Sequence, residues 1–238
     1  IKNPVFFKKF HAECIGKKIL SVERRGKNIL IHLEKEKTIL IHMKMTGHML
    51  YGTYTKSILG KTKEETWMVT EHGPLRDDPY NGWIHFVITL SNKKHLALSD
   101  VRKFAKITLF NTTTVVSEPD IQNLGPDPTH PNTTYAVFKN RLYTKSKEKI
   151  KTALMNQALL AGIGNIYSDE ILWHSAVHPE SQVECTPEPM FRSIYRCTKL
   201  ILAQGIDFGG DSMSDYRNIH GGRGAFQHQH NAYRKTNH

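Results

Sequence analysis

The stretch that decides the fold is residues 150–175, IKTALMNQALLAGIGNIYSDEILWHS. Apolar side chains recur at helical spacing through residues 150–161, which predicts an amphipathic helix there. The Gly-Ile-Gly sequence at 162–164 is typical of a tight turn that side chains would hinder. Asn165 follows at a position suited to an N-cap, and a second apolar face continues through residues 166–172. The stretch therefore predicts two helices joined by a glycine turn.

The start of the second helix is a candidate anion site, because free backbone amides at a helix N-terminus bind negative charge. Four lysines lead into the first helix, at positions 145, 147, 149 and 151. They favour a nucleic-acid phosphate as the anion. The alternative is an ordinary helical hairpin whose glycines only permit close packing, since short glycine motifs are common.

The overall charge favours the same kind of partner. In 238 residues, 33 Lys and Arg face 22 Asp and Glu, giving a formal net charge of +11, which indicates a polyanionic partner. The length suits one large or two modest domains. No apolar run approaches membrane-spanning length, so we expect no membrane contact.

Cysteine and histidine usage predicts no metal site in this stretch. Cys14, Cys185 and Cys197 are widely spaced and form no CxxC pair, which indicates neither a disulfide framework nor a complete zinc site. We expect a reducing, cytoplasmic setting. The tail histidines, which are His220, His228, His230 and His238, fit no zinc-ligand spacing and are better interpreted as solvated loop residues.

The first half of the chain reads as β-rich. A short helix is expected behind Asn3-Pro4, ending at Gly16. Strand-like runs then follow at residues 19–24, 28–33, 38–43, 83–90, 95–99 and 106–110. Short charged turns between the first three predict an antiparallel meander, half of a sandwich or barrel. Residues 52–82 are polar and read as a long surface excursion.

The second half reads as helical. Residues 119–131 contain Gly-Pro-Asp-Pro and are the best linker candidate. Helical patterns follow at residues 135–142, in the central stretch and at 187–204, and residues 209–238 predict a flexible basic loop. We therefore predict an α+β fold divided into a β domain at 1–118, a linker at 119–132 and a helical domain at 133–238.

Six segments, taken together, carry a specific resemblance. They are SVERRGK at 21–27, HMKMTG at 42–47, DVRKF at 100–104, NLGPDP at 123–128, the helical stretch at 150–172, and YRKT at 233–236. In this order and spacing, the chain resembles the formamidopyrimidine-DNA glycosylase / endonuclease VIII family of base-excision repair enzymes. The resemblance implies an N-terminal antiparallel β-sandwich, incomplete here, and a helical domain with a helix–two-turn–helix unit that binds DNA.

The resemblance implies roles for individual residues on the DNA. Lys151 and Asn165 match positions that clamp phosphates beside the lesion, and Lys147 in the same lysine run is expected to bind DNA with them. Tyr216, in the glycine-rich tail, matches the loop that closes over an extruded oxidised purine. Lys27 matches a hairpin lysine that reaches into the active site.

A further trio, Met45, Arg102 and Phe104, matches side chains inserted into the duplex where the damaged nucleotide has been extruded. An apolar wedge and a guanidinium suit the gap left by a flipped base. Without the resemblance, Phe104 is equally well interpreted as a core residue, because Phe is usually buried.

The chain also departs from the family pattern. The family's nucleophile is an N-terminal proline followed by a catalytic glutamate, and neither is present near Ile1. The family typically ends in a zinc finger just after the segment matching residues 233–236. We expect the sequence to be an inner portion of a longer protein, with zinc in that C-terminal finger and no cofactor in this stretch. Trp83 stands where some relatives carry a DNA-contacting histidine.

The activity implied is that of a bifunctional DNA glycosylase and AP lyase. Such an enzyme excises oxidised bases, here oxidised purines by preference, and nicks the strand through a Schiff base. The implied partner is double-stranded DNA with a damaged base or an abasic site, bound by a monomer in the bacterial cytosol or nucleoid. The alternatives are a non-catalytic damaged-DNA-binding relative lacking the nucleophile, and a structural nucleic-acid module.

Overall fold

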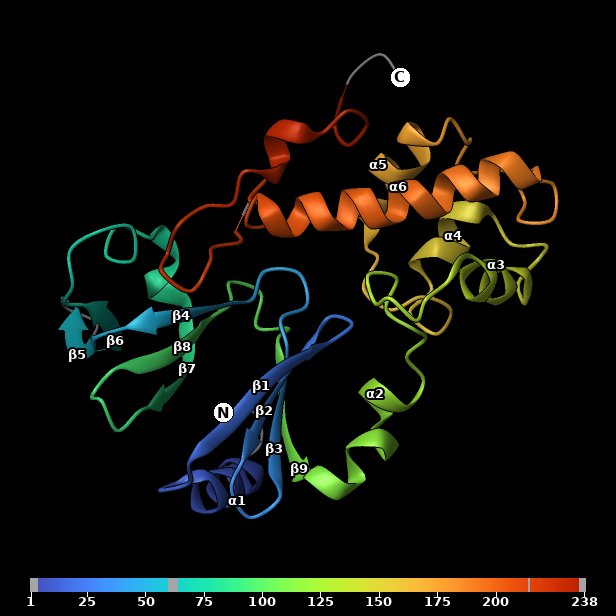
Figure 1. Cartoon of the computed structure of the whole chain (residues 1–238). Helices are drawn as coiled ribbons and strands as arrows, with labels where there is room; N and C mark the ends of the chain where they lie inside the picture. Colours follow the sequence, from blue (N-terminus) through green and yellow to red (C-terminus); the bar gives the residue numbers. More distant parts are fainter. Residues whose placement is uncertain (1–3, 60–63, 214, 236–238) are drawn as a thin grey trace. The chain divides into compact units, whose positions relative to one another are not determined.

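The computed structural model describes residues 4–59, 64–213 and 215–235. The chain forms two compact units, each assembled from two separate segments (Figure 1). The first comprises Ile1–His42 and Lys106–Lys199, and the second comprises Met43–Ala105 and Leu200–His238. The predicted α+β class is confirmed, because the strands come from the first half and the longer helices from the second, apart from the first helix. The domain limits of 118 and 133 stay a prediction.

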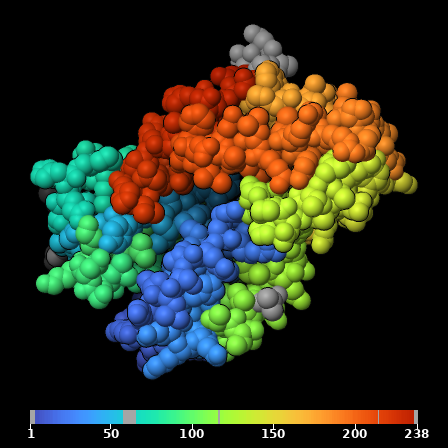
Figure 2. Space-filling view, viewed as in Figure 1, coloured from blue at the N-terminus to red at the C-terminus, as the bar shows by residue number. Residues whose placement is uncertain are grey.

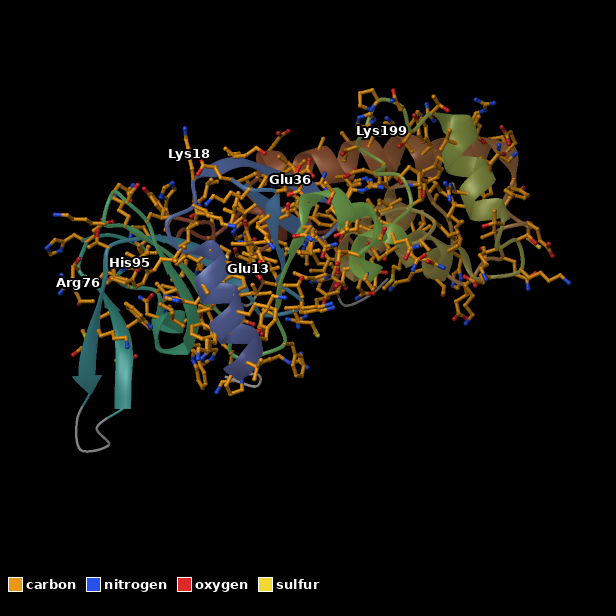
Figure 3. All side chains as sticks on the ribbon, turned by 90° about the horizontal axis from the view of Figure 1, so that it is seen from below. Glu13, Lys18, Glu36, Arg76, His95 and Lys199 are labelled. Carbon is orange, nitrogen blue, oxygen red and sulfur yellow. The ribbon has the colours of Figure 1, made fainter. Side chains whose placement is uncertain are left out.

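The first unit begins with a helix and an antiparallel sheet in the order β1-β2-β3-β9. The elements are α1 (Pro4–Cys14), β1 (Ile19–Arg25), β2 (Asn28–Leu33), β3 (Lys37–His42) and β9 (Lys106–Asn111). The predicted strands are confirmed to within a residue or two at their ends. Glu13 of α1, labelled in Figure 3, pairs with Lys37 at the start of β3. The predicted cap Asn3 lies outside the described residues.

One face of this sheet forms a core with the segment that follows it. Leu30 and Leu40, paired across β2 and β3, pack with Phe110 and with Ile121 of the short helix α2 (Pro119–Gln122). A 3-10 helix, η3 (Thr112–Ser117), leads into α2. The expected linker therefore begins as a helix that buries one apolar side chain.

The rest of the first unit is helical. Its helices are α3 (Tyr135–Tyr143), α4 (Ile150–Met155), α5 (Asn165–His174) and the first part of α6 (Glu188–Asp207). Thr134 caps α3 by accepting a hydrogen bond from the amide of Val137. The side chains that α6 buries recur at helical spacing, as Phe191, Ile194, Thr198 and Ile201, and its outer side is exposed on the face seen in Figure 2. No helix in the described part of the chain has the length and apolarity needed to cross a membrane.

Two details of the central prediction were wrong. The first helix does not run to residue 161 but ends at Met155, because Asn156 adopts extended backbone and its Oδ1 accepts a hydrogen bond from the amide of Ala158 at 3.0 Å. The N-cap of α5 is Gly164, so Asn165 is the first helical residue instead.

The second unit contains a three-stranded antiparallel sheet in the order β4-β8-β7 and a separate hairpin. The strands are β4 (His48–Gly52), β7 (Ile84–Thr89), β8 (His95–Ser99), and in the hairpin β5 (Tyr54–Leu59) and β6 (Glu64–Val69). A 3-10 helix, η2 (Pro79–Trp83), precedes β7, and η4 (Phe226–Gln229) lies in the tail.

The prediction that residues 52–82 form a surface excursion was wrong in part. Tyr54, Val69 and Leu75 from this stretch are buried in one core with Leu50 and Ala97. Figure 3 shows the hairpin extending away from the rest of the unit. The ring of His95 contacts the ring of Tyr54 at the start of β5 and that of Trp67 in β6. Residues 60–63, including Gly60, lie outside the described residues.

The tail of the second unit, predicted as a flexible loop, is irregular but tied down by hydrogen bonds. Buried Ser212 accepts a bond from the amide of Gly224 at 2.8 Å and donates one to the carbonyl of Tyr216 at 2.8 Å. A Cβ on Gly224 would lie 2.1 Å from the carbonyl oxygen of Gly210. Only glycine permits this approach of the two backbone segments.

Candidate nucleic-acid interface

The second unit brings Met45, Arg102 and Phe104 into one exposed cluster. Met45 is 73% exposed and Phe104 is 54% exposed. The Nη1 of Arg102 lies 3.1 Å from the sulfur of Met45, and its guanidinium carbon lies 4.8 Å from the centre of the Phe104 ring. The core interpretation of Phe104 was wrong. We call these three residues the wedge cluster.

A buried carboxylate shapes the loop that carries this cluster. Asp100 is 2% exposed and accepts hydrogen bonds from the hydroxyl of Thr46, the amide of Arg102 at 3.3 Å and the amide of Ala105 at 2.7 Å. Burial alone would raise the pKa of Asp100, but these hydrogen bonds to the charged form outweigh it and hold the pKa below 3.8. The sequence contained Asp100 within DVRKF but did not show this role.

The tight turn before β4 projects Met45 outward. The amide of Gly47 donates to the carbonyl of Met43 at 3.1 Å, and a Cβ on Gly47 would lie 2.5 Å from that same oxygen. Lys44 within the turn has a φ of 57°, which is unusual for a residue with a side chain.

In the first unit, the connection between α4 and α5 is held by one amide side chain. The Nε2 of Gln157 donates to the carbonyls of Met155 at 2.7 Å and Ile163 at 2.8 Å, while its Oε1 accepts from the amide of Gly162 at 2.9 Å. Gly162 has a φ of 109°, a conformation that favours glycine. Gln157 thus fixes the turn from which α5 starts.

The hairpin between β1 and β2 brings Lys27 to that helix start. A Cβ on Gly26 would lie 3.2 Å from the Cβ of Ala161, so the hairpin packs directly on the turn. The Nζ of Lys27 would lie 3.4 Å from a Cβ on Gly164, the N-cap of α5. Although Lys27 is exposed as a residue, partial desolvation of its ammonium lowers its pKa from the usual 10.5. An ammonium and the free amides of α5 therefore lie together, with Asn165 exposed beside them.

The lysine run before α4 is partly neutralised. Lys151 forms an ion pair with Asp169 at 2.6 Å, and Lys145 lies 3.8 Å from Glu148. Lys149 pairs with Glu180, whereas Lys147 is exposed. The run provides less free positive charge than its sequence suggests.

An ion pair joins the β1–β2 hairpin to the segment at residues 123–128. The Nη2 of Arg24 lies 2.6 Å from Oδ2 of Asp127, and its Nη1 donates to the carbonyl of Gly26 at 3.0 Å. A cavity of about 640 Å³ adjoins the pair, lined by Arg24, Arg25, Pro126, Asp127, Thr129, His130, Pro131, Asn132 and Thr133. The two motifs resembling the family thus support each other through a contact that sequence reasoning missed.

Tyr216 is 41% exposed and held by its backbone. Its carbonyl accepts hydrogen bonds from Ser212 and from the Nη1 of Arg217, both at 2.8 Å. A Cβ on Gly210 would lie 2.6 Å from the Tyr216 ring, so the ring packs on the glycine backbone. Partial burial raises the pKa of Tyr216.

The tail histidines differ in their surroundings. His220 and His228 are exposed, but His230 is 5% exposed and pairs with Asp211, so its interpretation as a solvated residue was wrong. His238, like Thr236 of the last motif, lies outside the described residues. Within the described ranges, no group of three or more His, Cys, Asp or Glu side chains is arranged to hold a metal ion.

The chain is similar to known proteins over most of its length. Residues 1–107 match the model of the formamidopyrimidine-DNA glycosylase N-terminal domain, and residues 124–217 match that of the formamidopyrimidine-DNA glycosylase H2TH domain. The formamidopyrimidine-DNA glycosylase of Heliobacterium modesticaldum is 33% identical over 212 residues, which is 89% of this chain and 69% of that protein. The Bacillus subtilis protein of the same name is 35% identical over 159 residues, or 67% of this chain and 57% of that protein.

Solved structures show the same similarity. The complex between Lactococcus lactis Fpg and DNA containing an abasic site matches with a TM-score of 0.75 and 28% identity, over 94% of this chain and 73% of that one. The MutM (Fpg) protein of Thermus thermophilus also matches with a TM-score of 0.75 and 28% identity, over 94% of this chain and 74% of that one. The chain belongs to the formamidopyrimidine-DNA glycosylase family.

Proposed function

We propose that this protein recognises damaged duplex DNA and removes oxidised bases from it as a DNA glycosylase. The observation that carries the proposal is the wedge cluster, in which Met45 and Phe104 are held exposed on either side of Arg102. Large apolar side chains gathered in one exposed cluster indicate an interaction surface, whereas scattered ones do not. The names of the relatives, and the DNA complexes solved for the Lactococcus lactis protein, support this assignment.

The wedge cluster suits the space left by an extruded nucleotide. Flipping a base out of the helix costs a few kcal/mol of stacking and pairing energy. Insertion of Met45 and Phe104 would recover apolar contact with the neighbouring bases. The guanidinium of Arg102 would offer hydrogen bonds to the base left without a partner. Buried Asp100 would keep the loop in shape during insertion.

The start of α5 supplies the complementary contact with the backbone. Its free amides, the ammonium of Lys27 and the exposed Asn165 form one positive site that fits a phosphate. Lys147 and Lys151 add charge from the segment that leads into α4, although Lys151 must share its charge with Asp169.

The finer proposal is AP lyase chemistry with a preference for oxidised purines. An amine nitrogen attacks C1′, the glycosidic bond breaks, and the base leaves with the bonding electrons. The C1′–O4′ bond then breaks as O4′ takes up a proton, which opens the sugar and leaves an iminium at C1′. The iminium makes the C2′ proton acidic, that proton is lost, and the C3′–O3′ bond breaks so that the 3′ phosphate leaves with the bonding electrons. Lys27 would place positive charge beside the reacting sugar, and the loop carrying Tyr216 would close over the extruded base.

The test uses the protein as the cell makes it, on a duplex with an abasic site, with borohydride present. We expect nicking in the presence of EDTA and a covalent protein–DNA product. Retention of trapping by Lys27→Ala would assign Lys27 a supporting role, whereas loss of trapping with unchanged affinity for the abasic duplex would identify Lys27 as the nucleophile. Binding to the abasic duplex without nicking or trapping would contradict the lyase and leave a damage-binding protein. Zinc in a C-terminal finger and the monomeric state stay predictions.

A further inference from the structure

The two neighbours of Tyr216 are anchored to one short turn, η2. On one side, hydrogen bonding to the Asp215 carboxylate raises the pKa of the Tyr80 hydroxyl. On the other side, Nε of Arg217 lies 3.8 Å from Oδ1 of Asp78, and its guanidinium carbon lies 5.2 Å from the centre of the Tyr80 ring. Tyr216 is therefore presented between two anchored residues.

The anchor is buried and charged. The side chain of Asp78 is fully buried and that of Arg217 is 9% exposed. Asp78 Oδ1 also accepts a hydrogen bond from the amide of Tyr80 at 3.1 Å, which starts η2. His48 Nε2 lies 3.5 Å from the other oxygen of Asp78. Removing one member of such a group leaves a buried charge without compensation.

The same turn supports the wedge cluster. The hydroxyl of Ser99 donates to the carbonyl of Tyr80 at 2.7 Å, and the amide of Asp100 donates to the carbonyl of Trp83 at 3.0 Å. Asp100 is the residue whose carboxylate shapes the wedge loop. His48, which faces Asp78, also lies 3.4 Å from the carbonyl of Thr46 through its Nδ1.

We propose that Asp78 and Tyr80 are positioning residues that couple the loop carrying Tyr216 to the wedge cluster, so that gap filling and capture of the extruded base occur together. This inference rests on the proposed function. The Asp78–Arg217 ion pair joins η2 to the loop carrying Tyr216, and hydrogen bonds from Ser99 and Asp100 join it to the wedge loop, so displacement of either loop disturbs the other. A side chain that touches no DNA would therefore change how firmly the wedge enters the duplex.

The mildest test is Tyr80→Phe, which removes the bond to Asp215 and keeps the ring beside Arg217. The probe is a duplex with a tetrahydrofuran abasic-site analogue opposite 2-aminopurine, whose fluorescence reports unstacking of the opposite base. We expect affinity for this duplex to fall about threefold to tenfold, the range of one lost hydrogen bond, with no change for intact duplex. The fluorescence change on binding should also become smaller.

A double-mutant cycle with Phe104→Ala separates coupling from a simple loss of contact. In the Phe104→Ala background, Tyr80→Phe should change the affinity less than about twofold, because the wedge that it positions is already impaired. Arg223→Lys is the matched control, since Arg223 bonds within its own loop to the carbonyl of Ser212 at 2.9 Å. Asp78→Asn should give a larger effect than Tyr80→Phe. If Asp78→Asn does not fold, Tyr80→Phe decides alone.

Additive effects in the cycle, or an equal loss for intact duplex, would overturn the coupling while leaving the proposed function intact. Failure of the unmodified protein to prefer the abasic duplex over intact duplex would instead overturn the proposed function, and the coupling with it. The coupling also requires that Tyr80→Phe melts at the same temperature as the unmodified protein. A large decrease in its melting temperature would show that Tyr80 has a purely structural role.

Discussion

The Nζ of Lys151 lies 2.6 Å from Oδ1 of Asp169, so this candidate phosphate ligand already has a carboxylate partner. A phosphate bound by Lys151 must compete with that carboxylate or share the ammonium with it. The strength of DNA binding therefore depends on the acid as well as on the lysine.

Lys151→Ala should weaken binding to every duplex alike and reduce the slope of log affinity against log salt by about one or less. Asp169→Asn should strengthen binding, because it frees the ammonium. Fluorescence anisotropy across a salt series measures both. Lys149→Ala removes the same charge from a lysine paired with Glu180 and serves as the control. Affinity that does not vary with salt would contradict phosphate binding.

Phe104→Ala and Met45→Ala should each change the free energy of unfolding by less than about 0.5 kcal/mol, since both side chains are exposed. They should nevertheless impair binding to abasic duplex more than to intact duplex. Urea titration measures these free energies. In the control Phe226→Ala, which truncates a side chain only 1% exposed, the free energy of unfolding should fall by about 3–5 kcal/mol. A loss of that size for Phe104→Ala would show that its side chain is buried in the core and does not act as a wedge.

The buried carboxylate of Asp100 should make the free energy of unfolding depend on pH in the acid range. Its pKa in the folded protein lies below 3.8, so the stability that the carboxylate contributes is complete above that pH and is lost as pH falls through the lower value. Asp100→Asn should destabilise the second unit by about 1–3 kcal/mol near neutral pH, because buried donors lose an acceptor. Urea unfolding of both proteins should show this difference shrinking as pH falls below 3.8. A constant difference would mean that folding does not lower the pKa of the carboxyl.

Position 125 should tolerate only glycine. A Cβ at this position would lie 2.4 Å from the carbonyl oxygen of Leu159. The amide of Gly125 donates a hydrogen bond to the carbonyl of the nearby Gln157 at 2.9 Å. Gly125→Ala should therefore destabilise the turn before α5 and weaken DNA binding. Gly82→Ala is the control, since a Cβ at that position meets nothing within 4 Å. Thermal unfolding and anisotropy on the two variants distinguish the outcomes.

Local patterns predicted the strands well, because alternating β-branched residues in runs such as residues 28–33 act over short distances. The hairpin that ends at Val69 was missed, because polar residues interrupt its apolar pattern. Among its described residues, Tyr54 and Val69 are buried in the core and Trp67 packs against it. The helix end at Met155 was missed because the apolar pattern continues beyond it. Leu159 and Ala161 continue the apolar pattern while the backbone follows Asn156 and Gln157 into turns.

The candidate site was predicted through the resemblance and not through spacing. Met45 and Arg102 are 57 residues apart in sequence, and no periodicity relates them. The supporting contacts are as distant, such as Thr46 with Asp100 and Arg24 with Asp127. Such pairs depend on the completed fold, so a single sequence indicates the residues that touch DNA more readily than those that hold them.

The two-segment construction of the second unit sets an order of events during synthesis. The apolar cluster around Leu50 is complete once Ala97 and the strands up to Ser99 have been made. Arg217 follows more than a hundred residues later, which at ribosomal speed is a delay of roughly 5–25 s. During that interval Asp78 is without its arginine, and β4 is without the hydrogen bond that Tyr51 makes to the carbonyl of Ile219. The nascent chain thus exposes a buried acid and a sheet edge that chaperones are suited to protect.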